Sequence, residues 1–146
     1  MRIAFGSDMT NELTDAIARW LRERDYEVAT FGALRAGDDD AWTTMARAVG
    51  EAVASGACAQ GIVCCWTGTG ASIAANKVPG VRAALCGDAA TAAGAREWND
   101  ANVIALSLRL TSVALGEEIL AAWFAGEPTR DPAYRAMIAD LVARDR

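Results

Sequence analysis

A cysteine at the end of a short apolar run is followed at once by a turn of glycine and threonine. The run is Gly61–Cys65, the turn is Thr67–Gly70, and a helical pattern begins near Ala71. Small residues let backbone N–H groups approach a ligand, and the start of a helix adds positive potential, so this order of elements favours an anion-binding turn. Cys65 lies at its mouth, where a helix N-terminus favours the thiolate form of a cysteine.

The same stretch also has a purely structural interpretation. Glycines make tight strand-to-helix turns without any ligand, and cysteines pack as small hydrophobic residues. Cys64 and Cys65 are adjacent in the sequence, so their side chains point to opposite faces of a strand and make poor disulfide partners. A thiol redox function that would use this pair therefore ranks last among the functions considered.

Composition narrows the classes of function. The chain has 146 residues with a net charge of −5 and shows no basic stripe, which argues against a nucleic-acid partner. No apolar run is long enough to span a bilayer, and the N-terminus lacks the apolar core of a signal peptide, so no membrane partner is expected. We therefore expect a cytoplasmic protein with reduced cysteines, folded as one domain over residues 1–146.

The sequence contains no histidine, which removes the commonest general base and metal ligand. It also excludes a Ser/His or Cys/His nucleophile pair within the chain. The acidic run Asp38–Asp40 offers no substitute metal site, because three adjacent carboxylates converge poorly on one ion. We expect a solvated loop there, and no metal.

Strand and helix patterns alternate along the chain. Short apolar runs predict strands at residues 2–5, 27–31, 61–65, 81–86 and 102–107. Helical spacing and capping residues predict helices that start near residues 10–11, 42, 71, 88, 111–112 and 132. This alternation indicates an α/β fold: a three-layer αβα sandwich with a five-stranded parallel Rossmann-like sheet, plus a C-terminal helix. Such sheets bind ligands beyond the carboxyl ends of their strands, which places Asp8, Cys65, Asp88 and Arg109 on one rim.

Three segments carry a family resemblance: Ile3–Asp8, Gly61–Lys77 and Asn99–Val103. The most specific string is Ser-Ile-Ala-Ala-Asn-Lys, which ends at Lys77 after the glycine turn. With these segments the chain resembles the type B ribose-5-phosphate isomerases and the related galactose-6-phosphate isomerase subunits over nearly its whole length. The resemblance implies a small-molecule enzyme without metal or organic cofactor, which works as a homodimer or homotetramer with shared active sites.

The resemblance also implies a role for each matching position. Cys65 falls where many members keep the cysteine that moves a proton between C1 and C2 of the open-chain sugar. Thr67 lies beside that base, Asn99 helps to stabilise the enediolate, and Asp8 binds sugar hydroxyls. The expected substrate-binding positions are the anion hole of Gly68, Thr69, Gly70 and Ser72, the site-lining Trp42, and the phosphate-side Arg109, Arg130 and Arg135.

The residue types suit this chemistry. Aldose–ketose isomerisation removes a proton next to a carbonyl group, so it needs one base and a set of donors for the developing oxyanion. A thiol has an unperturbed pKa of about 8.5, which is within tuning range of neutral pH.

The chain departs from the family at its histidines. Met9 and Trp98 stand where the family commonly has histidine, the latter at the ring-opening position beside the asparagine, and a third histidine is missing near Pro132. Trp66 replaces a glycine directly after the base. We expect Trp42, Trp66 and Trp98 to line a pocket recut for a different sugar, with core or interface packing as the alternative.

These observations predict an aldose–ketose isomerase for a pentose or hexose, free or phosphorylated, that acts through a cis-enediolate. The substrate is expected to differ from ordinary ribose 5-phosphate. Asp8, Thr67 or water would assist ring opening, unless the enzyme relies on open-chain substrate. The alternative is a non-catalytic sugar-binding or regulatory subunit of an isomerase assembly.

Overall fold

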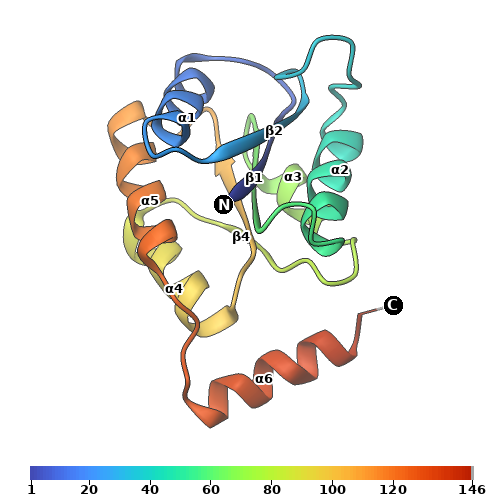
Figure 1. The fold of residues 1–146 in the computed structure, drawn as a ribbon, viewed down its shortest axis with the longest axis vertical. Coiled ribbons are helices and arrows are strands. Elements are labelled where there is room, and N and C mark those ends of the chain that lie inside the picture. Colours follow the sequence, from blue (N-terminus) through green and yellow to red (C-terminus); the bar gives the residue numbers. More distant parts are fainter. Residues whose placement is uncertain (146) are drawn as a thin grey trace.

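Five parallel strands form the centre of the computed structural model, which describes residues 1–145 (Figure 1). The strands are β1 (Arg2–Ser7), β2 (Glu27–Gly32), β3 (Gln60–Cys65), β4 (Ala83–Leu85) and β5 (Val103–Ser107). They pair in the order β2-β1-β3-β5-β4, and every neighbouring pair is parallel. The predicted sheet is therefore confirmed, although β4 is shorter than its apolar run.

Helices cover both faces of the sheet. They are α1 (Glu12–Arg22), α2 (Trp42–Ala54), α3 (Thr69–Ala75), α4 (Ala89–Asn99) and α5 (Val113–Ala125), and a further helix, α6 (Pro132–Ala143), follows them. Figure 1 shows α1, α4 and α5 on one side and α2 and α3 on the other, which confirms the three-layer sandwich. No helix within residues 1–145 is long and apolar enough to cross a membrane.

The strands supply a separate hydrophobic core to each face because successive side chains alternate. In β3, Ile62 and Cys64 belong to the core under α1, α4 and α5, whereas Val63 and Cys65 belong to the core under α2 and α3. The two adjacent cysteines thus point to opposite faces, as predicted, and both are free thiols.

The first strand extends further than its apolar run indicates. Ser7 still pairs with Gly32 on β2 and with Cys64 on β3. Because β1 continues to Ser7, the following Asp8 lies at the carboxyl end of the sheet beside the end of β3. The first helix then starts after Asn11, whose side chain accepts hydrogen bonds from the N–H groups of Leu13 and Thr14.

The last helix stands apart from the rest of the molecule (Figure 1). None of the α6 side chains is buried, and Met137 and Leu141 are 65% and 51% exposed. After the helix, the Asp145 carboxylate accepts the Gly80 N–H at 2.7 Å. The helix therefore touches the body at its two ends while much of its apolar surface stays open.

Candidate active site

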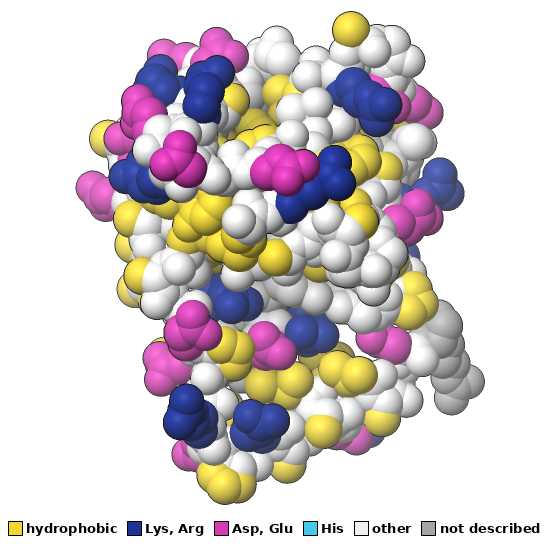
Figure 2. Space-filling view, viewed as in Figure 1, with side chains coloured by type: hydrophobic (Ala, Val, Ile, Leu, Met, Phe, Trp, Pro, Cys, Tyr) yellow, Lys and Arg dark blue, Asp and Glu magenta, His cyan; other side chains and the backbone are white. Residues whose placement is uncertain are grey.

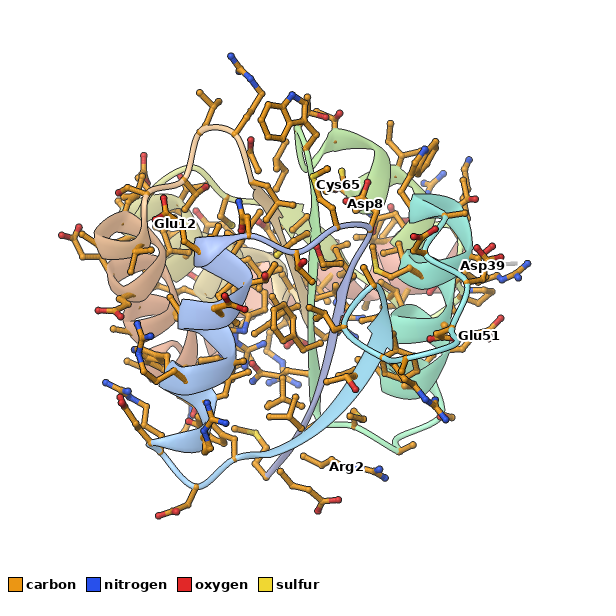
Figure 3. All side chains as sticks on the ribbon, turned by 90° about the horizontal axis from the view of Figure 1, so that it is seen from above. Arg2, Asp8, Glu12, Asp39, Glu51 and Cys65 are labelled. Carbon is orange, nitrogen blue, oxygen red and sulfur yellow. The ribbon has the colours of Figure 1, made fainter. Side chains whose placement is uncertain are left out.

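Asp8 and Cys65 lie at the carboxyl ends of neighbouring strands. The Asp8 N–H donates a hydrogen bond to the Cys64 carbonyl oxygen at 3.3 Å, which continues the β1–β3 pairing by one residue. Figure 3 shows the two side chains next to one another, with Arg2, at the start of β1, at the far end of the strand. We call this rim of the sheet the carboxyl edge.

The two adjacent cysteines differ in their surroundings. Cys64 is completely buried, and burial, with smaller contributions from Cys65 and Asp8, raises the pKa of the Cys64 thiol far above its ordinary value. Cys65 is 5% exposed and ends the strand. Of this pair, only Cys65 combines a position at the carboxyl edge with any exposed surface, so it is the better placed of the two for chemistry.

The turn after Cys65 requires glycine. Gly68 has a φ of +74°, and a Cβ added there would lie 2.9 Å from the Leu106 backbone carbon. The Gly68 N–H bonds back to the Cys65 carbonyl oxygen at 3.2 Å, and α3 begins at the next residue. The turn therefore directs the start of α3 towards the space beyond the strand ends.

Three further predicted residues surround this turn. The hydroxyl oxygens of Thr67 and Thr69 are 2.7 Å apart, and both side chains are exposed. The Trp42 ring packs against Gly70, where an added Cβ would lie 3.0 Å from the ring. Because of this contact, one of the three predicted site-lining tryptophans lies against the predicted anion-binding turn. Trp42 is also 44% exposed.

The Asp8 carboxyl group is unusual in its hydrogen bonding and in its pKa. Its Oδ1 is buried and has no hydrogen-bond partner among the described residues. Burial raises the pKa of Asp8 above its ordinary value, and the nearby Asp40 carboxylate raises it further, against a lowering by the residue's own backbone. A carboxyl group of this kind holds a proton more readily than an exposed one.

The loop after β5 lies on the same rim. The Arg109 N–H and the Ser107 hydroxyl both donate to the Trp66 carbonyl oxygen at 3.0 Å. The Trp66 side chain itself is 56% exposed. On the same rim, Asp88 caps α4 by accepting the Thr91 N–H at 2.7 Å. Asp8, Cys65, Asp88 and Arg109 thus share the carboxyl edge, as the strand order predicted.

The acidic run before α2 lies in an exposed loop. The Asp38 and Asp39 carboxylates accept the backbone N–H groups of Gly32 and Ala41, both at 2.9 Å. Within the described residues, no cluster of three or more His, Cys, Asp or Glu side chains is close enough to hold a metal ion.

Asn99 and Trp98 lie at the opposite rim, which we call the amino edge. Asn99 ends α4, and the chain enters β5 a few residues later, whereas Cys65 pairs with the last residue of that strand, Ser107. A five-residue strand separates the two edges by about 13 Å. One chain therefore does not bring Asn99 to Cys65.

A charged clamp fixes the backbone next to Asn99. Asp100 has a left-handed backbone with a φ of 47°. The Arg82 side chain donates to the Asp100 carbonyl oxygen at 2.7 Å and to its carboxylate at 3.2 Å. The buried Arg96 lies 3.8 Å from the same carboxylate and donates to the Ala101 carbonyl oxygen.

The remaining predicted residues also gather at the amino edge. Trp98 packs over Gly94 and, with Leu85 and Leu141, lines a cavity of about 790 Å³ between α4, β4 and α6. Arg135 lines a smaller cavity of about 360 Å³ beside Asp100, and Arg130 is exposed in the segment before α6. Figure 2 shows the hollow between α6 and the body, with hydrophobic side chains around it.

Comparisons with known proteins identify the family. Residues 3–139 match the family described as Ribose/Galactose Isomerase. Over 128 residues, 87% of this chain and 84% of that protein, the chain is 35% identical to the D-erythrulose-4-phosphate isomerase of Pectobacterium atrosepticum. Over 127 residues, 86% of this chain and 85% of that protein, it is 38% identical to the ribose-5-phosphate isomerase B of Escherichia coli.

The solved structure of Clostridium thermocellum ribose-5-phosphate isomerase B has the same fold, with a TM-score of 0.89 and 39% identity. The match covers 98% of this chain and 96% of that one. The chain therefore belongs to the ribose/galactose isomerase family, whose members are sugar-phosphate isomerases that interconvert aldoses and ketoses. The resemblance inferred from the sequence is confirmed.

The charged clamp was not predicted from the sequence. A role was predicted for Asn99 but for neither Asp100 nor Arg82, although Asp100 belongs to a segment that carries the resemblance. An acidic residue directly after a helix end was the available signal, because Asp tolerates the left-handed backbone that often ends a helix.

Proposed function

We propose that this chain is an aldose–ketose isomerase in which Cys65 carries a proton between C1 and C2 of a sugar phosphate. The observation that carries the proposal is the position of Cys65: it ends β3 at the carboxyl edge, directly before a glycine turn and a helix N-terminus. Membership of a sugar-phosphate isomerase family supplies the reaction class, and the relatives act on phosphorylated sugars of different lengths, as their names state.

The proposed reaction uses one base and fixed donors. The Cys65 thiolate removes the proton from C2 of the aldose, and the electrons move into the carbonyl group to give an enediolate. The first helical hydrogen bond of α3 joins the Ser72 N–H to the Gly68 carbonyl oxygen at 3.1 Å, so the N–H groups of residues 69–71 have no helical partner. They are suited to bind the oxyanion while the hydroxyl proton passes from O2 to the adjacent O1 and Cys65 returns the carbon-bound proton to C1, which gives the ketose.

The proposed site is completed by a second copy of the chain. Asn99, Arg130 and Arg135 lie at the amino edge, so within one chain they are remote from Cys65. A partner that brings its amino edge to this carboxyl edge would supply an amide for the enediolate and guanidinium groups for the phosphate. The exposed apolar face of α6 supports such an assembly, because a surface of this kind is usually covered by a partner.

The proposal is tested with the two neighbouring cysteines as a matched pair. Cys65→Ala should reduce deuterium exchange, at C2 of an aldose or at C1 of a ketose, by about 10²- to 10⁴-fold, the usual contribution of a positioned base. Cys64→Ser should retain exchange in the fraction that folds, because Cys64 faces the other core. The measurement is proton NMR in D₂O with ribose 5-phosphate, ribulose 5-phosphate and D-erythrulose 4-phosphate.

Two outcomes would contradict the proposal. Equal loss of exchange in folded Cys65→Ala and Cys64→Ser proteins would remove Cys65 as the base. Sugar phosphates that stabilise the wild-type protein without any deuterium exchange at C1 or C2 would favour a non-catalytic binding subunit.

A further inference from the structure

We infer that the substrate enters this site already in open-chain form, so that the enzyme isomerises sugar phosphates without opening their rings. The class of substrate is then a sugar phosphate in which the phosphate ester blocks ring closure, and four-carbon sugar 4-phosphates are the simplest aldose–ketose pair of this kind. The inference rests on the proposed function of Cys65 and concerns the groups around it.

Ring opening makes a demand that isomerisation does not. The ring oxygen must gain a proton while the anomeric hydroxyl loses one, so an enzyme needs an acid and a base at two adjacent oxygens. Imidazole is the usual group for such transfers near neutral pH. The chain contains no histidine, so an assembly of identical copies contains none either.

Three of the charged or titratable groups at the carboxyl edge cannot serve as the acid or the base of ring opening. In the proposed function Cys65 is the base that removes the proton from carbon, so it is not available for the ring oxygen. Asp88 caps α4, and its hydrogen bonds with Thr91 lower the pKa of Asp88, so its carboxyl group does not hold a proton to donate. Arg109 carries a guanidinium group, which donates hydrogen bonds but is not a general acid or base.

Asp8 is the remaining candidate, and its geometry limits it to one oxygen. Oδ1 is buried and has no partner among residues 1–145, while the residue as a whole is half-buried, so Oδ2 is the oxygen that faces outward. One oxygen cannot donate to the ring oxygen and accept from the anomeric hydroxyl in the same step. Asp40 lies near Asp8, but it is exposed and, within the described chain, no side-chain hydrogen bond holds its carboxylate.

Apolar side chains occupy the positions next to the proposed site residues. Met9 follows Asp8, Trp66 follows Cys65 and Trp98 precedes Asn99, and these three are 43%, 56% and 48% exposed. None of them can accept a proton. At the amino edge, Asp100 is held by Arg82, so its carboxylate is not free to act as a base. Apart from the exposed Asp40 and the weakly acidic hydroxyl groups of Thr67 and Thr69, the described residues of the two edges supply no second proton-transfer group.

An enzyme that lacks a ring-opening acid and base is suited to sugar phosphates that cannot close a ring. Ribose 5-phosphate closes a five-membered ring through its free O4. In ribulose 5-phosphate the corresponding ring would need O5, which carries the phosphate, so this ketose stays open. In a four-carbon 4-phosphate the phosphate is on O4, and neither the aldose nor the ketose can form a five-membered ring.

The test compares the two directions of one sugar pair at increasing enzyme concentration. From ribulose 5-phosphate and from D-erythrulose 4-phosphate, the initial rate should rise in proportion to enzyme. From ribose 5-phosphate, the rate should reach a ceiling equal to the spontaneous rate of ring opening, measured separately by NMR saturation transfer. A ribose 5-phosphate rate that rises past that ceiling would overturn the inference.

Two variants separate this inference from the proposed function. If Cys65→Ala abolishes exchange while the wild type passes the ceiling, the proposed function stands and the inference fails. If the wild type exchanges none of the three sugars, both fail. At enzyme concentrations well below the ceiling, Asp8→Asn should slow the isomerisation of ribose 5-phosphate and of ribulose 5-phosphate by the same factor. A larger loss with ribose 5-phosphate would show that Asp8 opens rings, against the inference.

Discussion

The two edges of the sheet differ in how they hold their functional groups. At the carboxyl edge, Cys65 and Asp8 follow directly from buried strands, and the Gly68 turn is fixed by contact with backbone. At the amino edge, Asn99 ends an exposed helix turn, and ionic contacts from Arg82 to Asp100 fix the backbone beside it. The proposed base and the proposed oxyanion turn therefore belong to one rim, together with Arg109, and Asn99, Arg130 and Arg135 belong to the other.

This difference teaches how one small chain can specify a complete site. Parallel strands place their ends at opposite rims, so no short loop joins Cys65 to Asn99 within the chain. Each rim alone lacks part of the proposed chemistry: the carboxyl edge has the proposed base without Asn99, Arg130 and Arg135, and the amino edge has these three residues without a base. The proposed assembly of two copies would resolve both deficits at once.

The largest expected effect comes from mixing variants of the two edges. Cys65→Ala and Asn99→Ala homodimers should each be nearly inactive. A mixed dimer, isolated with two different affinity tags, combines both changes in one of its sites and leaves the other intact. It should recover about half of the wild-type exchange rate, because the symmetry of the dimer generates two equivalent sites.

The matched control combines two variants of the same edge. In a mixed dimer of Cys65→Ala and Asp8→Ala, both sites carry one defect, so activity should not return. Recovery in this control, or none in the first pair, would show that each site is built within one chain and would remove the distinction between the edges.

Much of the fold could be predicted from the sequence because its signals are local. Alternating apolar patterns gave the strand and helix order, and that order placed Asp8, Cys65, Asp88 and Arg109 on one rim. Capping chemistry also located the helix starts: Asn11, Asp88 and Ser112 each accept a backbone N–H near the start of their helices.

Other features depend on packing between distant segments, which local patterns do not contain. Arg82 and Asp100 are 18 residues apart, and their contact forms only when β4 lies beside β5. The burial of Asp8 Oδ1 results from the surrounding elements. The apolar spacing of α6 predicted a helix, but spacing alone cannot show that this helix leaves the body with its apolar face open.

A smaller effect is expected from the clamp at the amino edge. Asp100→Ala removes the Arg82 contact and places alanine in a left-handed backbone, so we expect a loss of about 1–3 kcal/mol in the free energy of unfolding, measured by denaturant titration. Asp140→Ala on α6 is the matched control. It breaks the exposed ion pair with Arg144, and such pairs contribute about 0–1 kcal/mol. An equal effect of both changes would mean that Asp100 is an ordinary surface residue.

The smallest effect concerns the stability that the carboxyl edge loses by keeping Asp8 half-buried. Burial raises the pKa of Asp8 above 3.8, so over the range between that value and the raised pKa the folded protein holds a proton that the unfolded chain has released. Stability from this group is therefore present at low pH and lost as pH rises through the raised pKa. Asp8→Asn removes the titration while keeping the size of the side chain.

We therefore compare melting temperatures by subtracting the wild-type value from the Asp8→Asn value. This difference should be more positive at pH 7 than at pH 3.5, and the Asp8→Asn protein should catalyse deuterium exchange of the substrate more slowly than the wild type. The corresponding difference for Asp100→Asn should be negative at pH 7, since that carboxylate has a guanidinium partner in the folded state. Opposite signs for the two aspartates would mean that one edge keeps a carboxyl group at the expense of stability and the other uses one to hold its backbone. A pH-independent difference for Asp8→Asn would remove that distinction, because the Asp8 carboxyl group would then titrate alike in the folded and unfolded chains.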